Sequence, residues 1–99
     1  MEQWLPIGSP LEVSTSIPSI QAYPNPTKNE LTISIQQLIA DNAAMVIFNS
    51  LGQLVHQQQL KANANQQIIL NVEQYKTGIY FISIGGDGQT PILQKFTKL

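Results

Sequence analysis

The sequence predicts an all-β fold, an antiparallel β-sandwich of about seven strands. Apolar and polar residues alternate with a period of two in several short segments, of which Leu31–Gln36 is the clearest. Residues typical of turns separate these segments at close spacing, as at Gly85–Gly88. The candidate for a helical turn, Gln36–Asn42, is too short to form a stable helix. Together these observations favour two small packed sheets of three or four strands each.

The first half of the predicted domain contains one half-buried strand and one hairpin. Leu31–Gln36 places its apolar residues on a single face, which predicts the half-buried strand. Met45–Phe48 is a short apolar run and is predicted to be a central strand covered on both faces. Asn49–Gly52 follows as a turn, because glycine reaches positive φ at little cost. With a partner strand beginning at Leu54, residues 44–59 are predicted to form a hairpin.

The second half contains three further strands. Ile68, Leu70 and Val72 alternate again, with Asn71 between the last two, and Thr77–Gly78 then breaks the chain. After this break, the alternating residues 80, 82 and 84 are predicted to face the core. Gly85–Gly88 is a hairpin signal that leads into the last strand.

The last strand, Ile92–Leu99, is predicted to lie at a sheet edge. Lys95 and Lys98 interrupt its alternation, and charged side chains are a common protection of exposed strand edges. A bulge is one explanation of the uneven pattern. We therefore expect an edge strand, and the sequence does not show which of its side chains point outward and which point inward.

Size and charge limit the functions that the chain can have. Its 99 residues suit one domain, and 42% hydrophobic with 11% charged residues favour a folded core over disorder. The lysines are scattered, arginine is absent and the formal net charge is −1. Nucleic-acid binding requires clustered basic side chains, so nucleic acid is not expected as a partner.

Residues 1–19 are predicted to be an extended linker, and residues 20–99 the folded domain. Proline and serine are frequent in the first segment, which disfavours regular structure there. Trp4 could dock on the domain as a short added strand or lie exposed. The start of the chain lacks the pattern of a signal peptide, and no apolar run is long enough for a membrane span.

Residues with catalytic or metal-binding chemistry are sparse and dispersed. His56 is the only histidine, cysteine is absent, and the carboxylates show neither a paired nor a calcium-loop pattern. We therefore expect no enzyme, no cofactor and no metal site. Trp4, Tyr23 and Tyr75 are also dispersed, so a carbohydrate-binding module is an alternative with little support. A passive spacer or docking module is a further alternative.

Several fragments, taken in order and spacing, match one known pattern. They are Tyr23-Pro24-Asn25-Pro26, then Leu31-Thr32-Ile33, Asn49 to Val55, Gly78 to Ile82, and Lys95 to Leu99. In this register the chain resembles the C-terminal sorting domain of type IX (Por) secretion cargo in Bacteroidetes, from about Ile20 onward. The motif residues are Pro24, Asn25, Pro26, Gly52, Val55, Gly78 and Tyr80. Tyr75 departs from the family, which usually has leucine before the glycine turn.

The resemblance implies an Ig-like sandwich attached to the end of a secreted protein. It implies that a type IX outer-membrane translocon recognises the last strands, with Lys95, Phe96, Lys98 and Leu99 as the residues at their end. It also implies a cargo domain on the N-terminal side, passage through the periplasm, and release or attachment at the outer-membrane surface. A sortase-like peptidase would remove the domain, and we expect the cleavage between Ser14 and Gln21. A homodimer through an edge strand is left open.

Overall fold

Seven strands form the whole regular structure of the part of the chain described by this computed structural model, residues 18–36, 42–61, 65–88 and 90–99. In chain order they are β1 (Ser19–Tyr23), β2 (Glu30–Gln36), β3 (Ala44–Asn49), β4 (Leu54–Gln59), β5 (Asn65–Asn71), β6 (Gly78–Gly85) and β7 (Ile92–Lys98). Every strand pair is antiparallel. The predicted all-β sandwich of about seven strands is confirmed.

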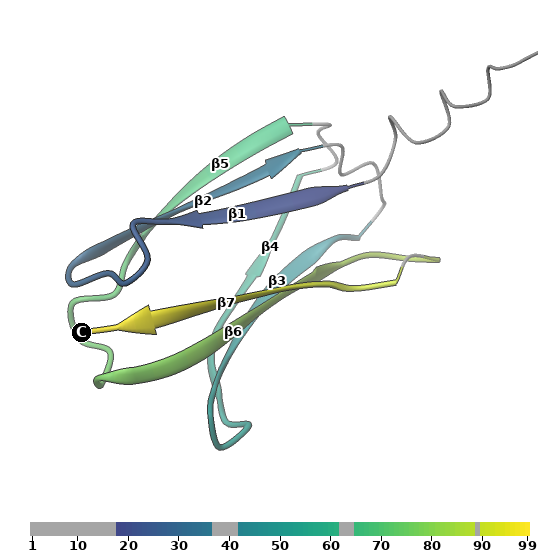
Figure 1. Ribbon diagram of the computed structural model, residues 1–99. Coiled ribbons are helices and arrows are strands. Elements are labelled where there is room, and N and C mark those ends of the chain that lie inside the picture. The colour runs from purple at the N-terminus through teal and green to yellow at the C-terminus, as the bar shows by residue number, and fades with distance from the viewer. Residues whose placement is uncertain (1–17, 37–41, 62–64, 89) are drawn as a thin grey trace, which may run out of the picture.

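The strands divide into two facing layers. One sheet has three strands in the order β1-β2-β5, and the other has four in the order β4-β3-β6-β7 (Figure 1). The predicted hairpin over residues 44–59 is the β3–β4 pair, and β6 and β7 form the hairpin predicted around Gly85–Gly88. β7 is an edge strand of the four-stranded sheet, as predicted.

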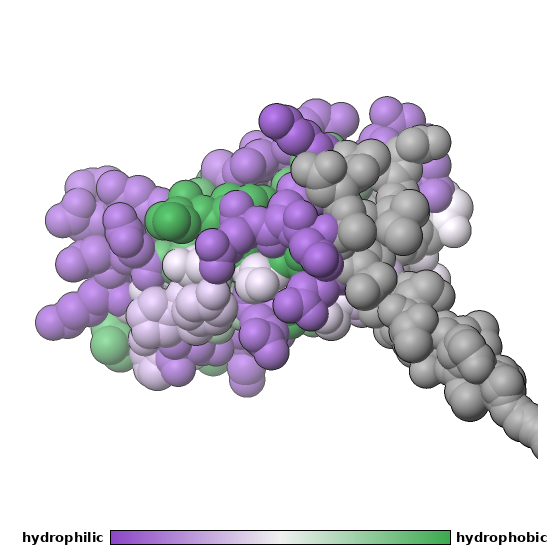
Figure 2. All heavy atoms as spheres, turned by 90° about the horizontal axis from the view of Figure 1, so that it is seen from above, coloured by the Kyte–Doolittle hydropathy of each residue, from purple (hydrophilic) through white to green (hydrophobic). Residues whose placement is uncertain are grey.

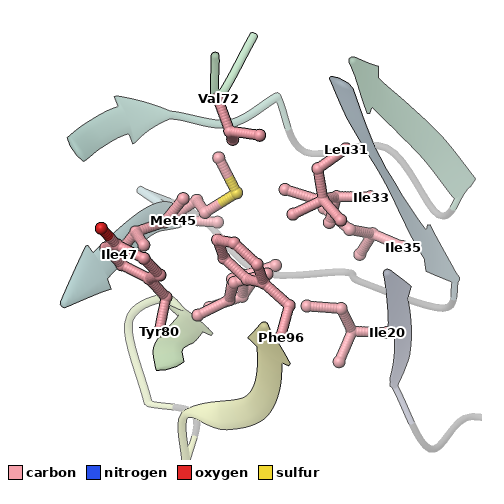
Figure 3. Packing of buried hydrophobic residues seen from close by; sticks show 12 residues of the cluster. Ile20, Leu31, Ile33, Ile35, Met45, Ile47, Val72, Tyr80 and Phe96 are labelled. Atoms are coloured by element: carbon pink, nitrogen blue, oxygen red, sulfur yellow. The ribbon is translucent and has the colours of Figure 1, made fainter. Parts of the chain in front are cut away.

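The hydrophobic core lies between the two sheets. Alternation along β2 buries Leu31, Ile33 and Ile35 completely, and they face buried residues from β3, β6 and β7. Figure 3 shows these side chains, with Phe96 among them, meeting in one cluster. Because every strand except β4 contributes inward-facing apolar residues at alternate positions, a period-two sequence is sufficient to define this core.

β3 differs from its prediction. Met45 and Ile47 are completely buried, but Val46 and Phe48 on the other face are only half-buried. A strand in the middle of a sheet has neighbours on both sides, yet a two-layer sandwich covers only one face of each sheet. The prediction that both faces of this strand are covered was therefore wrong.

Asn49 organises the turn between β3 and β4. Its side-chain oxygen accepts hydrogen bonds from the backbone N–H groups of Leu51 (3.0 Å) and Gln53 (2.9 Å). Gly52 adopts a φ of 83°, the left-handed conformation that glycine reaches most readily. The register shifts between Ile47 and Phe48, which places a bulge in this hairpin.

The last strand is more regular than its sequence suggests. The pairing of β6 with β7 runs without a register shift from Ile84 opposite Ile92 to Gly78 opposite Lys98, so the bulge considered for β7 is absent. Phe96 is fully buried, and Lys98, on the same face, is only 7% exposed. The alternation looks uneven in the sequence because two polar residues, Gln94 and Lys98, share the inward face with Ile92 and Phe96.

The first described strand begins at Ser19, one residue before the predicted domain boundary. Ser19 opens β1, and Ile20 is 9% exposed and belongs to the core. The part of the predicted cleavage stretch from Ser19 to Gln21 is therefore strand rather than flexible chain, because it pairs with β2. Trp4 and the rest of that stretch before residue 18 lie outside the described residues, as does the segment considered for a helical turn between residues 37 and 41.

Candidate functional site

The candidate site joins the family motif near the start of the domain to the last strand. Asn25 lies in the turn between β1 and β2, and Lys95 lies on β7, 70 residues later in the sequence. Figure 1 shows this turn and the C-terminal end of β7 at the same end of the sandwich. Two motifs that the sequence presents separately therefore form one structural unit.

Four hydrogen bonds connect the turn to the outer edge of β7. The Asn25 side chain donates from Nδ2 to the Lys95 carbonyl (3.2 Å) and accepts at Oδ1 from the Thr97 N–H (3.0 Å). The Thr27 N–H donates to the Thr97 carbonyl (2.9 Å), and the Leu99 N–H donates to the Thr27 carbonyl (2.8 Å). We call Asn25 and Thr27 together the clamp. It supplies the outer edge of β7 with the partners that an added strand would otherwise provide.

The local sequence explains the shape of the clamp. Pro24 and Pro26 flank Asn25, and both peptide bonds that precede these prolines are cis. Neither proline has an N–H, and their φ angles are fixed by the ring, so Asn25 is held between two rigid residues. Thr27 is 1% exposed, and its hydroxyl donates to the carbonyl of Glu30, which fixes the start of β2.

The structure divides the four predicted recognition residues between two environments. Lys95 is exposed and Leu99 is 54% exposed, whereas Phe96 is completely buried and Lys98 is 7% exposed. The Lys98 Nζ donates to the Leu99 carbonyl (3.0 Å), so its stem is buried while its ammonium reaches the end of the strand. A partner that meets the folded domain can contact the first pair directly but not the Phe96 ring.

Tyr80, near the start of β6, forms a corner between the core and the turn before this strand. Its hydroxyl donates to the Lys76 carbonyl (2.7 Å), four residues earlier, and its ring stacks on Phe96 with centroids 5.2 Å apart. Gly78, at a φ of 151°, opens the strand that carries Tyr80 inward. The predicted core position of Tyr80 is confirmed, at 5% exposed.

Tyr75 packs against this corner from outside the core. Its ring centroid lies 5.3 Å from that of Tyr80, and the residue is half-buried. Burial raises the pKa of the Tyr75 phenol above 10.0, with a smaller contribution from the neighbouring Tyr80 phenol. A tyrosine is thus accommodated where the family usually has leucine.

The remaining motif residues lie away from the clamp, near the opposite edge of the four-stranded sheet. Gly52 lies in the β3–β4 turn, and Val55, on the edge strand β4, is 39% exposed. The bulge at Ile47 and Phe48 leaves Val55 without a directly paired residue on β3. These residues shape the hairpin and do not contact β7.

Sequence reasoning missed Thr27 and the outward role of Leu93. Thr27 follows the Pro24-Asn25-Pro26 motif directly, and this adjacency is the only sequence signal for it. Leu93 is 68% exposed and shares the outward face with Lys95. Because side chains alternate along a strand, assigning Phe96 to the core places residues 93 and 95 on the outward face.

The residues examined for catalysis show ordinary surface contacts. The His56 Nε2 lies 3.1 Å from the Gln58 Oε1, and the Asp87 carboxylate accepts from the Asn42 side chain (2.8 Å). Within the described ranges, no group of three or more His, Asp or Glu side chains could hold a metal ion. In the same ranges no helix has the length and apolar character needed to cross a membrane.

Comparison with known proteins agrees with this geometry. The family described as secretion system C-terminal sorting domain matches residues 21–98, and this span contains the clamp and all of β7. An ulvan lyase of Nonlabens ulvanivorans is 39% identical over 71 residues, which make up 72% of this chain but only 12% of the relative. The chain belongs to the family of type IX secretion C-terminal sorting domains, and the domain is a sorting signal of an exported protein.

Proposed function

We propose that this domain directs an attached cargo protein across the outer membrane through the type IX translocon, and that a sortase-like peptidase then removes it and attaches the cargo to the cell surface. The observation that carries the proposal is the pair of hydrogen bonds between the Asn25 side chain and β7, because they join the family motif to the last strand of the domain. The cargo would lie on the N-terminal side of the domain. It would pass through the periplasm before reaching the surface or the medium.

The clamp favours recognition of side chains over recognition of the strand edge. Strand addition needs free backbone N–H and carbonyl groups, and the clamp occupies these groups from the Lys95 carbonyl to the Leu99 N–H. The exposed side chains of Lys95 and Leu99 remain accessible with the clamp in place. By the same reasoning, a homodimer through the β7 edge would have to use the part of the strand before the Lys95 carbonyl.

Cleavage is proposed on the N-terminal side of Ser19. From Ser19 onward the chain pairs with β2, and a peptidase would have to unpair the strand to bind it in an extended form. Mass spectrometry of the secreted cargo would locate the cut. A cut after Ile20 would contradict this assignment.

A single lysine exchange tests the function without disturbing the fold. Deleting the last five residues would also remove the buried Phe96 and the strand that the clamp holds, so loss of export would not distinguish recognition from unfolding. Changing Lys98 has a related difficulty, since that residue is buried. Lys95→Gln avoids both, and Lys28→Gln, at an exposed lysine of the β1–β2 turn, is the matched control.

The readout is the fraction of a fused reporter that reaches the surface or medium of a type IX-competent host. We expect Lys95→Gln to lower that fraction while Lys28→Gln leaves it unchanged. Equal export of the two variants would instead support a passive spacer module at this position.

A further inference from the structure

We propose that the domain docks through the outer face of its four-stranded sheet, and that the partner on the translocon is an apolar surface that carries a carboxylate. This inference rests on the proposed export function and extends it from the last strand to all four strands of the sheet. The outer apolar face is defined by Val46, Phe48, Leu54, Ile79, Phe81 and Leu93.

Strand register aligns part of this face in a single row. Leu54 pairs with Phe48, Phe48 with Phe81, and Phe81 with Lys95. Directly paired residues of antiparallel strands project from the same side of a sheet, so one row crosses all four strands. Leu54 is 53% and Phe81 40% exposed, and Phe48 between them is half-buried.

Neighbouring rows extend the apolar area on both sides. Val46 pairs with Ser83, which pairs with Leu93, and the Leu93 side chain is 68% exposed. On the other side of the central row, Ile79 is 41% exposed. Contiguous exposed apolar side chains on a small soluble domain mark interaction surfaces more often than isolated ones do.

The opposite sheet shows that this exposure is specific to one face. Across β1, β2 and β5, the outward row Gln21, Ser34 and Gln67 is entirely polar. Ile69, at 65% exposed, is the one large aliphatic residue among the described outward positions of that sheet, and Tyr23, at 44% exposed, lies in the same row. Figure 2, which views the molecule from above Figure 1, shows a mostly hydrophilic surface with a limited hydrophobic area. The domain therefore exposes extended apolar surface on the sheet that contains β7.

Lys95 determines the chemistry of the partner. It ends the central row, and its ammonium forms no ion pair within the described residues. Covering the face would remove this charge from water, which is costly unless the partner supplies an opposite charge. A second copy of the same face cannot do so, because β3, β4, β6 and β7 contain no acidic residue. The face thus fits a different protein with an acidic group beside an apolar patch.

The experiment measures export of a reporter fused to the full chain. The substitution is placed on β4, at the opposite edge of the sheet from β7, so that the last strand itself is unchanged. Leu54→Gln changes the face at β4, and Ile69→Gln makes the same kind of change on the opposite sheet. We expect Leu54→Gln to reduce the exported fraction several-fold and Ile69→Gln to leave it at the level of the unmodified domain. Leu54→Thr, which places a polar residue that strands favour, repeats the test if Leu54→Gln melts at a lower temperature than the control.

Changing the charge of Lys95, at the end of the row, tests whether the partner carries a carboxylate. Lys95→Arg keeps the positive charge and is expected to preserve export, whereas Lys95→Glu is expected to abolish it. Export of the Leu54 variants at the level of Ile69→Gln would overturn the docking face, and normal export of Lys95→Glu would overturn the acidic partner. Failure of the unmodified fusion to be exported would instead overturn the proposed function itself.

Discussion

Replacing Asn25 by alanine removes both side-chain hydrogen bonds that hold the β1–β2 turn against β7, those to the Lys95 carbonyl and from the Thr97 N–H. A single intramolecular hydrogen bond contributes about 0.5–1.5 kcal/mol net. Both bonds are exposed, so water replaces them in part, and we expect a combined loss of about 1 kcal/mol. For a domain of this size, that loss lowers the melting temperature by roughly 4–8 °C.

Two measurements check this prediction. Thermal unfolding followed by circular dichroism gives the change in stability, and hydrogen exchange reports the Thr97 amide, which we expect to exchange faster in the variant. Asn29→Ala is the matched control, because it deletes the same side chain from the same turn at an exposed position, and this side chain makes no hydrogen bond within the described part of the chain. Equal melting temperatures and equal Thr97 exchange in both variants would show that the clamp does not hold β7.

Three further predictions concern the Tyr80 corner and the buried lysine. Tyr80→Phe removes the bond to the Lys76 carbonyl and should lower the free energy of unfolding by about 1 kcal/mol in urea titration. The raised pKa of Tyr75 means that the folded state favours the neutral phenol, so stability should fall as pH rises above 10.0, and Tyr75→Phe should lose less over that range in parallel melts. Lys98→Met, which keeps a long apolar stem, should melt close to the wild type, whereas Lys98→Ala should melt lower.

Those predictions have clear contradicting outcomes. An unchanged unfolding free energy in Tyr80→Phe would mean that the corner bond is dispensable. Parallel alkaline transitions in Tyr75→Phe and wild type would assign the loss of stability to other groups, and equal melting of the two Lys98 variants would mean that its stem does not pack.

Local patterns were sufficient to predict six of the seven strands and most of the core, whereas β1 was not assigned from the sequence. Leu31, Ile33 and Ile35 alternate because one face of β2 lies on the core, and the same rule correctly placed Tyr80. The hairpin turns were also predictable, because Gly52 occupies a backbone conformation that few other residues adopt at low cost. These features depend on residues close together in the chain.

Features that depend on distant residues were not predictable in the same way. The clamp brings Asn25 and Thr27 to Thr97, and no local pattern encodes a contact over 72 residues. The face of Lys98 was left open because charged residues are rarely buried, but its long stem lets the ammonium reach the Leu99 carbonyl while the stem stays inside. The partial exposure of the outer face of β3 was missed because a strand in the middle of a sheet was assumed to be covered on both faces.

The sequence identifies the motif residues, but it does not show which of them contact one another or which are exposed. The family motif was visible in the sequence, yet only the fold shows that Asn25 bonds to the strand proposed for recognition. Likewise, Lys95 and Lys98 look equivalent in the sequence, whereas only Lys95 is exposed to a partner.

The most direct test of the central claim compares two hosts. A periplasm-directed fluorescent reporter is fused to the full chain and expressed in a type IX-competent bacterium and in the same strain without its type IX translocon. The account predicts reporter on the surface or in the medium of the competent strain and retention in the periplasm of the other. The same location in both strains would contradict the assignment of this domain as a type IX export signal.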